Sequence, residues 1–327
     1  MPLPQITNCP GTLAGGFDTY SRTCLKRVFD GHKVSHILPY ESPLKKNNEH
    51  ELFEANKTSI SISGVQEKFS VILKKNKLRL ATEGERGTYI LKPIPSIEKN
   101  GDQMPANEHL TMQIARQVYG IETAENALIF FSNGAPAYIT RRFDMNEDGS
   151  KRAQDDFASL GGRTPQTHGE HYKYQGNYLE LFELMKRYIP AYKSEAPKLF
   201  RLILFNYLFS NGDAHYKNFS VIETPLGDYR LSPAYDLLNS RIHIADKDFA
   251  LDDGLLPPRL AKGKIRKQFQ VLAKEAGISE TVCETIITLM TSQSEKTTSL
   301  IRTSFLNERI KRSYLQDYQT RLNKLIR

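Results

Sequence analysis

The first half of the chain alternates short apolar runs with polar turns, a pattern typical of β-strands. We expect strands at 69–73, 78–80 and 88–91, and a hairpin of 127–131 with 137–140 around Ser132-Asn133-Gly134. Two segments have helical spacing instead: a short one at 24–29, and 108–118, which Gly120 would end as a C-cap.

The second half follows the helical period. Apolar residues recur every three or four positions in 178–188 and 199–209, and a small hairpin is expected at 219–231. After Pro257-Pro258 we expect helices at 269–276, at 279–290 and from 299 to the end. Strands followed by helices predict an α+β protein with a strand-rich lobe, residues 1–145, and a helical lobe, residues 146–327.

Composition narrows the class of protein. With 25% charged and 39% hydrophobic residues over 327 positions, the chain has a globular composition, which excludes collagen-like, coiled-coil and disordered classes. No apolar run is long enough to cross a bilayer, and the first residues do not form a secretory signal. Three cysteines without a CxxC pair disfavour a disulfide framework, so we expect a cytoplasmic protein.

The segment 210–218 carries the clearest chemical pattern. Asp213 and Asn218 have the D-x-x-x-x-N spacing of a kinase catalytic loop, in which the carboxylate accepts a hydroxyl proton and the amide oxygen holds magnesium. His215 or Lys217 could meet a phosphate. The alternative interpretation is an Asx-rich turn that ends a helix.

Asp236 follows the expected 219–231 hairpin, as the metal-binding aspartate of kinases follows a short β-ribbon. Its alternative role is an N-cap. Lys92 ends an apolar strand, where a kinase lysine reaches the ATP phosphates, and Glu108 at the start of the next helix is placed to pair with it. A solvent-exposed lysine is the alternative.

The serine-rich segment Ser61-Ile-Ser63-Gly64 precedes the first clear strand. Small residues allow backbone N–H groups to approach phosphate oxygens, although the segment is neither a P-loop nor a G-x-G-x-x-G loop, and a plain linker is the alternative. The loop, the strand lysine, the helix glutamate, D-x-x-x-x-N and the final aspartate occur in the order that kinases use. That order favours phosphoryl transfer.

These residues together resemble the HipA family of bacterial serine/threonine kinases, the toxins of toxin–antitoxin modules. The matching segments are Ser61-Ile-Ser-Gly64-Val-Gln66-Glu-Lys68, Tyr89-Ile-Leu-Lys92-Pro93, Asn107-Glu108, Arg142-Phe143-Asp144, Gln154-Asp155-Asp156, Lys173-Tyr174, Asn211-Gly-Asp213-Ala-His215-Tyr-Lys-Asn218-Phe-Ser220 and Tyr235-Asp236-Leu237. The resemblance implies a two-lobed kinase-like fold that uses ATP and Mg²⁺.

The resemblance also implies residue roles. Asp213 would be the catalytic base, and Asn218 and Asp236 would bind magnesium. ATP would contact the loop Ser63, Gly64, Val65, Gln66, Glu67 and Lys68, together with Lys92, Glu108, His215, Lys217 and Tyr235. Arg142 and Phe143 would lie at the adenine hinge. Ser61 matches the serine that the family autophosphorylates, and Ser63 is a second hydroxyl there, so their phosphorylation is expected to inhibit.

About 60 residues precede the serine loop, which is similar to the short HipT form, without the extra N-terminal subdomain of long HipA proteins. The resemblance implies an aminoacyl-tRNA synthetase substrate, tryptophanyl- or glutamyl-type, whose phosphorylation blocks translation and halts growth. It also implies a small HipS-like partner and a DNA-binding HipB-like antitoxin, with DNA contacted only through that partner and no membrane.

Two other functions stay open. One is a catalytically idle kinase fold that acts as a scaffold or corepressor beside a DNA-binding antitoxin. The other is direct nucleic-acid binding, because the chain carries a net charge of +8 and has 13 Lys/Arg but only 6 Asp/Glu from residue 262 onward. No recognition motif accompanies that charge, and such runs are usually solvated.

Overall fold

The computed structural model describes residues 3–43, 57–58, 67–96, 99–146 and 148–327, with only the backbone of 57–58. The chain divides into two compact units. Unit 1 contains Met1–Gln113, Ala124–Gly149 and Thr298–Arg312, and unit 2 contains Ile114–Thr123, Ser150–Thr297 and Ser313–Arg327. The division therefore passes within three helices, α3 (Met104–Gln117), α10 (Ser294–Thr303) and α11 (Glu308–Ile326).

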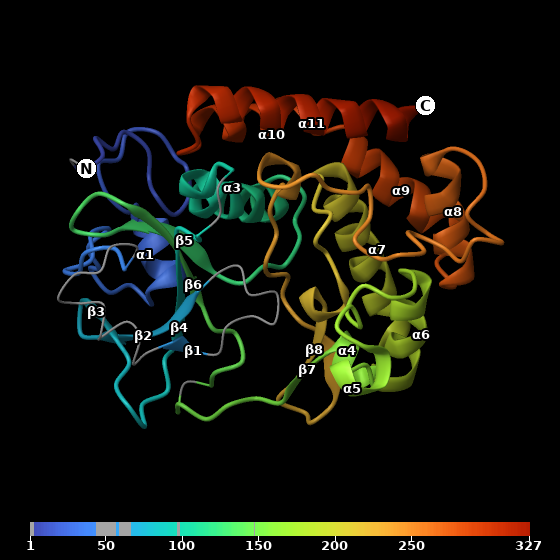
Figure 1. The fold of residues 1–327 in the computed structure, drawn as a ribbon, viewed down its shortest axis with the longest axis horizontal. Helices are drawn as coiled ribbons and strands as arrows, with labels where there is room; N and C mark the ends of the chain where they lie inside the picture. Colours follow the sequence, from blue (N-terminus) through green and yellow to red (C-terminus); the bar gives the residue numbers. More distant parts are fainter. Residues whose placement is uncertain (1–2, 44–56, 59–66, 97–98, 147) are drawn as a thin grey trace. The chain divides into compact units, whose positions relative to one another are not determined.

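Unit 1 is built on an antiparallel sheet of six strands (Figure 1). The strands are β1 (Lys57–Thr58), β2 (Lys68–Lys74), β3 (Lys77–Leu80), β4 (Tyr89–Pro93), β5 (Asn126–Phe130) and β6 (Pro136–Arg141). Their order is β1-β2-β4-β6-β5, with β3 paired to β2. The expected hairpin is present as β5–β6, which pairs Ala127 with Ile139, and Gly134 has the positive φ of 83° that its turn requires.

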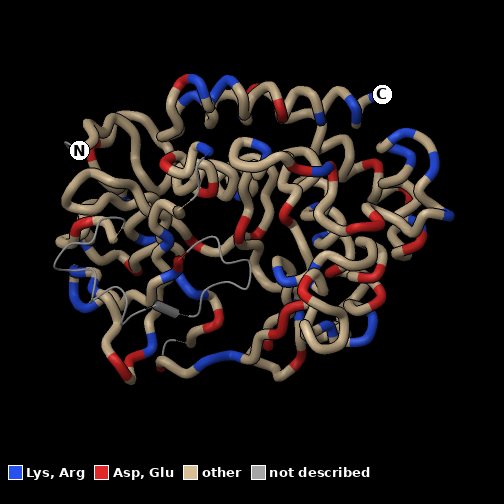
Figure 2. The backbone as a smooth tube through the Cα atoms, viewed as in Figure 1, with Lys and Arg blue, Asp and Glu red and all other residues tan. Residues whose placement is uncertain are grey.

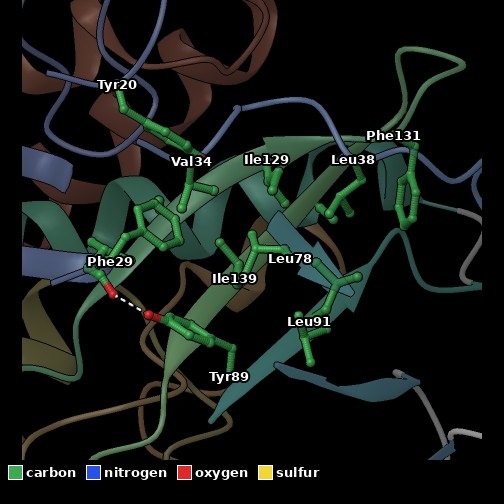
Figure 3. Close-up of a cluster of buried hydrophobic side chains, with 14 of the residues drawn as sticks. Tyr20, Phe29, Val34, Leu38, Leu78, Tyr89, Leu91, Ile129, Phe131 and Ile139 are labelled. Carbon is green, nitrogen blue, oxygen red and sulfur yellow. Dashed lines mark hydrogen bonds between the residues drawn. The ribbon is translucent and has the colours of Figure 1, made fainter. Parts of the chain in front are cut away.

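The core of unit 1 lies on one face of this sheet. Alternate residues of β2, β4 and β6 point into it because successive side chains of a strand face opposite ways. Figure 3 shows Tyr89 of β4 and Ile139 of β6 beside Phe29 and Val34 from the N-terminal segment. The Tyr89 hydroxyl donates a 2.8 Å hydrogen bond to the Val28 carbonyl, which satisfies the one polar atom that this ring buries (Figure 3).

Helix α1 (Arg22–Val28) packs on β5 and begins at Ser21, whose hydroxyl accepts from the Cys24 N–H. All three cysteines are free and buried. A 3₁₀ turn, η1 (Gly101–Gln103), leads into α3, and Gln113 of α3 donates to the Asn126 side chain at 2.9 Å.

Unit 2 combines helices with a three-stranded sheet of order β7-β8-β9. Its elements are β7 (Gln154–Asp156), α4 (Phe157–Leu160), α5 (Pro165–His168), α6 (Leu179–Tyr188), α7 (Tyr192–Leu208), η2 (Tyr216–Asn218), β8 (Ser220–Glu223), β9 (Tyr229–Leu231), η3 (Ser240–Ile242), α8 (Ile265–Glu275) and α9 (Glu280–Thr291). Helix α7 is the centre of the unit: it packs against α6, α9 and β9.

The structure corrects two expectations and adds one strand that was not expected. Helix α3 begins at Met104, so Glu108 lies one turn inside it and does not open it. The helix expected from 299 onward is two helices, α10 (Ser294–Thr303) and α11, because the Asn307 side chain accepts from the Ile310 N–H and starts a new helix. The added strand is β7, whose polar sequence Gln-Asp-Asp lacks the alternation that marks a strand.

In the described part of the chain, no helix is long and apolar enough to span a membrane. Figure 2 shows that acidic residues accompany the basic ones in the C-terminal helices. Several of the cations there form ion pairs: Arg266 with Glu284, Lys311 with Glu308, and Arg321 with Asp248. Glu284 and Glu308 are already counted in the balance after residue 262, so of these three pairs only that of Arg321 with Asp248 offsets part of the basic excess.

Candidate active site

The loop that carries Asp213 is shaped by the end of α7. Ser210 takes a left-handed conformation with φ of 54°, and the Asn211 N–H bonds back to the Asn206 carbonyl at 2.9 Å. The buried guanidinium of Arg321 lies beside this turn, with its Nε 3.4 Å from the Ser210 hydroxyl and an ion pair to Asp248 of 2.6 Å. The chain therefore leaves the helix in a fixed direction just before Asp213.

Asp213 is the carboxylate of this loop. Its side chain remains 42% exposed, so a substrate can reach it. The Tyr174 hydroxyl donates to Asp213 Oδ1 at 2.7 Å. Partial burial raises the pKa of Asp213, while the hydrogen bond from Tyr174 and the positive charge of Lys173 lower it.

Asn218 closes the loop through two hydrogen bonds with one residue. Its side-chain oxygen accepts from the His215 N–H at 3.1 Å, and its own N–H donates to the His215 carbonyl at 2.9 Å. An amide oxygen has two lone pairs, so Asn218 Oδ1 keeps one for a metal ion. His215 is nearly buried, which lowers its pKa to about 3, so it is neutral and adds no positive charge to the loop.

Asp236 follows the β8–β9 hairpin, as expected, and has a left-handed φ of 54°. The Asn211 side chain donates to the Asp236 carbonyl at 3.4 Å, and the Tyr235 hydroxyl donates to the Lys217 carbonyl at 2.9 Å. These bonds tie the segment to the Asp213 loop. The charge of Asp236 also contributes to the raised pKa of Asp213.

The residues in this part of unit 2 fit a magnesium ion. Asp236 and Asn218 offer a carboxylate and an amide oxygen, and the buried Oδ1 of Asn211 has no hydrogen-bond partner in the described chain. Magnesium in phosphoryl-transfer sites is held by one or two protein oxygens together with waters and phosphates. Among the described residues, no three His, Cys, Asp or Glu side chains are grouped so that they could hold a metal ion by themselves, and a magnesium site of this kind does not need such a group.

In unit 1, Lys92 of β4 and Glu108 of α3 form an ion pair of 2.6 Å. Their side chains are only 5% and 3% exposed. Lys92 Nζ also lies 5.3 Å from the ring centre of Tyr138, the cross-strand neighbour of Lys92 on β6. The lysine is therefore held inside the unit, and the solvated alternative for it is wrong.

The remaining predicted residues divide into described and undescribed ones. Arg142 forms a two-bond ion pair with Asp144, at 2.9 and 2.7 Å, which raises the pKa of Arg142, and Phe143 is half-buried. Glu67 and Lys68 lie at the start of β2 and are half-buried. Ser61, Ser63, Gly64, Val65 and Gln66 lie outside the described residues.

The structure adds one carboxylate that no sequence pattern indicated. Asp246 bonds to the Ser240 hydroxyl, and that hydroxyl accepts from the Gly212 N–H at 2.9 Å. A Cβ on Gly212 would lie 2.3 Å from Asp246 Cγ, so only glycine allows this approach. Asp246 follows Asp213 by 33 residues and lies in a segment without regular structure, so no periodic pattern marks it. The one related feature in the sequence is Gly212, whose lack of a side chain allows Asp246 to approach.

A cavity of about 850 Å³ lies elsewhere in unit 1, between the β2–β3 hairpin and residues 34–40. It contains none of the predicted site residues. Its walls include Val34, Leu38, Tyr40, Lys75, Leu78 and Arg79.

Comparison with known proteins shows to which family the chain belongs. The model of the HipA-like C-terminal domain matches residues 60–298. The chain belongs to this family. The family predicted from the motifs is thus confirmed, and the match covers the serine loop, Lys92, Glu108 and the Asp213–Asp236 region.

Curated relatives of this HipA-like chain are named as kinases. It is 32% identical over 209 residues to "Putative kinase Y4dM" of Sinorhizobium fredii, an alignment of 60% of this chain and 48% of that protein. A "Putative kinase" of Haemophilus influenzae is 27% identical over 194 residues, which is 55% of this chain and 52% of that protein. The chain thus spans about half the length of the curated relatives it matches.

Two solved structures show the fold. HipA of Shewanella oneidensis, in a complex with HipB and its operator DNA, matches with a TM-score of 0.63 at 20% identity over 88% of this chain and 72% of that chain. The proinflammatory kinase CtkA of Helicobacter pylori matches with a TM-score of 0.53 at 14% identity over 82% and 93%. The expected α+β, kinase-like fold is confirmed.

Proposed function

We propose that the chain is an ATP-dependent protein kinase that phosphorylates serine or threonine hydroxyls. The observation that carries this proposal is the half-exposed carboxylate of Asp213, held by Tyr174 and followed by Asn218 and Asp236 in the order that kinases use. The kinase names of the curated relatives support it.

In this reaction Asp213 accepts the proton of the substrate hydroxyl. The hydroxyl oxygen forms a bond to the γ-phosphorus of ATP, the bond from that phosphorus to the bridging oxygen breaks, and ADP leaves with the electron pair. Asn218 and Asp236 would hold Mg²⁺, which neutralises phosphate charge when bound. Lys92, kept in place by Glu108, would bind ATP phosphates, with Arg142 and Phe143 near adenine.

The test is transfer of labelled γ-phosphate from ATP with magnesium, by wild-type protein and by Asp213→Asn. We expect Asp213→Asn to lower kcat by about 10²-fold to 10⁴-fold, because a general base contributes that much, and to retain ATP affinity. Lys92→Met and Asp236→Asn should each weaken ATP binding. A wild-type chain that binds ATP and transfers no phosphate would instead favour the idle scaffold or corepressor.

The finer parts of the proposal concern substrate and regulation. We propose an aminoacyl-tRNA synthetase as substrate, and autophosphorylation of Ser61 or Ser63 as a brake on activity. Purified tryptophanyl- and glutamyl-type synthetases, incubated with the chain and ATP, should lose aminoacylation in one case and keep it in the other. Mass spectrometry of the chain should find phosphate at Ser61 or Ser63, and none in Asp213→Asn.

For the biological setting we propose a cytoplasmic toxin of the short HipT-like form. A HipB-like antitoxin, through which DNA is contacted, and a HipS-like protein would be its partners. The complex of the Shewanella protein with HipB and operator DNA supports the first of these. Co-expression with the neighbouring genes, followed by copurification and a growth assay, tests both.

A further inference from the structure

Lys173 and Tyr174 lie against the Asp213 loop although they precede it by 40 residues. The Tyr174 hydroxyl donates to Asp213 Oδ1 at 2.7 Å. Its ring meets the His215 ring edge-on, with centroids 5.1 Å apart. Tyr174 therefore contacts both ends of the Asp-x-His segment.

The backbone of this pair is tied on both sides. The Lys173 carbonyl accepts from the Tyr216 N–H at 3.2 Å, inside the Asp213–Asn218 loop. The Tyr174 carbonyl accepts from the Asp252 N–H at 2.8 Å. A residue held at its own carbonyl and at the carbonyl before it has little freedom, so the phenol is presented to Asp213 in one orientation.

Lys173 brings a positive charge to the same place. The residue is only 5% exposed, and its Nζ lies 4.9 Å from the Tyr174 ring centre. Asp236 and Asp246 add negative charge around Asp213, which a nearby ammonium group offsets.

Tyr174 and Lys173 leave one oxygen of the Asp213 carboxylate, Oδ2, available. The Tyr174 hydroxyl donates to Asp213 Oδ1, and no hydrogen bond to Oδ2 occurs among the described residues. The side chain is 42% exposed, so Oδ2 is open to a substrate hydroxyl. A base with one oxygen fixed and one free is positioned for proton transfer.

We propose that Tyr174 and Lys173 are positioning residues for the catalytic base: Tyr174 fixes the orientation of the Asp213 carboxylate, and Lys173 balances the negative charge around it. This inference rests on the proposed kinase function. It gives a role to two residues of the 161–178 segment, which lies outside the D-x-x-x-x-N motif.

The test compares Tyr174→Phe with Tyr172→Phe as a matched control. Tyr172 is buried two residues away, and its hydroxyl forms no bond in the described structure. We expect Tyr174→Phe to lower kcat about 10-fold to 100-fold with KM for ATP within twofold of wild type, because a misplaced reacting group costs that much. Tyr172→Phe should leave kcat unchanged. Lys173→Met should also lower kcat, and Lys173→Arg should restore part of it.

A second measurement does not depend on activity. Tyr174→Phe, Asp213→Ala and the double variant form a cycle in which urea midpoints are compared. If the hydrogen bond exists, Tyr174→Phe will shift the midpoint in the wild-type background and not in Asp213→Ala. If the two substitutions change the urea midpoint additively, or if kcat of Tyr174→Phe stays within twofold of wild type, the role of Tyr174 is wrong and the proposed kinase function is unaffected. A wild-type chain without any phosphoryl transfer would overturn the proposed function, whatever the cycle shows.

Discussion

Lys92 and Glu108 form a 2.6 Å ion pair inside unit 1, with both side chains almost fully removed from solvent. A buried pair is costly to break because the remaining charge stays in a poorly solvated place. In contrast, Arg79 and Glu85 of the same unit form a pair at the surface, with side chains 31% and 35% exposed. The two pairs allow a direct comparison.

We expect Glu108→Ala to lower the free energy of unfolding by about 3–5 kcal/mol. Glu85→Ala should lower it far less, because solvent screens that surface pair. Urea unfolding of both variants measures the difference. Equal losses would show that Lys92 is solvated once Glu108 is gone.

Gly212→Ala tests the approach of Asp246 to the Asp213 loop. The new Cβ would lie 2.3 Å from Asp246 Cγ, so either Asp246 or the loop must move. We expect kcat to fall about 10-fold to 100-fold. Gly15→Ala is the control, because its Cβ meets only the Asn8 side chain at an ordinary 3.6 Å.

The same clash predicts that the two sites are coupled. In an Asp246→Ala background the atoms that a Cβ on Gly212 would meet are absent, so Gly212→Ala should have little further effect on kcat. Independent effects of the two substitutions would contradict the contact between Gly212 and Asp246.

Gly11→Ala tests the packing of the N-terminal segment. A Cβ there would lie 2.0 Å from the Sγ of Cys24 and 2.9 Å from its Cβ, in the buried core of unit 1. Overpacking of this kind costs about 1–3 kcal/mol. Thermal unfolding should show a lower midpoint for Gly11→Ala and partial recovery in Gly11→Ala/Cys24→Ala. A midpoint equal to that of wild type would mean that the segment adjusts freely.

The burial of two histidines predicts that the folded chain is less stable at acidic pH. Burial lowers the pKa of His109 to about 4 and that of His215 to about 3, whereas both titrate near 6.5 in the unfolded chain. The unfolded chain therefore binds more protons as pH falls below about 6.5, and stability decreases down to the folded pKa values. Each residue should account for about 2 kcal/mol between pH 7 and pH 5.

Urea unfolding at pH 7 and pH 5 measures this loss. His109→Gln/His215→Gln should lose less stability over that interval than wild type does, whatever its stability at pH 7. His168→Gln, at an exposed position, is the matched control for the substitution. An unchanged pH dependence in the double variant would show that the two rings do not stay neutral in the fold.

Much of the fold could be predicted because local patterns decide it. Alternation located β2, β4 and the β5–β6 hairpin, and helical spacing located α6, α7, α8 and α9. The start of α3 and the break between α10 and α11 could not be predicted, because neither the 3₁₀ turn before Met104 nor the cap at Asn307 leaves a periodic signal. The polar strand β7 forms only because β8 pairs with it.

By itself, the sequence determined which chemistry is present: the spacing of Asp213 and Asn218, the hairpin before Asp236 and the lysine at the end of a strand follow from local order along the chain. Only the tertiary structure decided what surrounds each group. Tyr174, Lys173, Asp246 and Arg321 reach the Asp213 region from segments far away in sequence. A carboxylate's pKa and orientation depend on such neighbours, and packing of distant segments, which no local pattern records, brings them there.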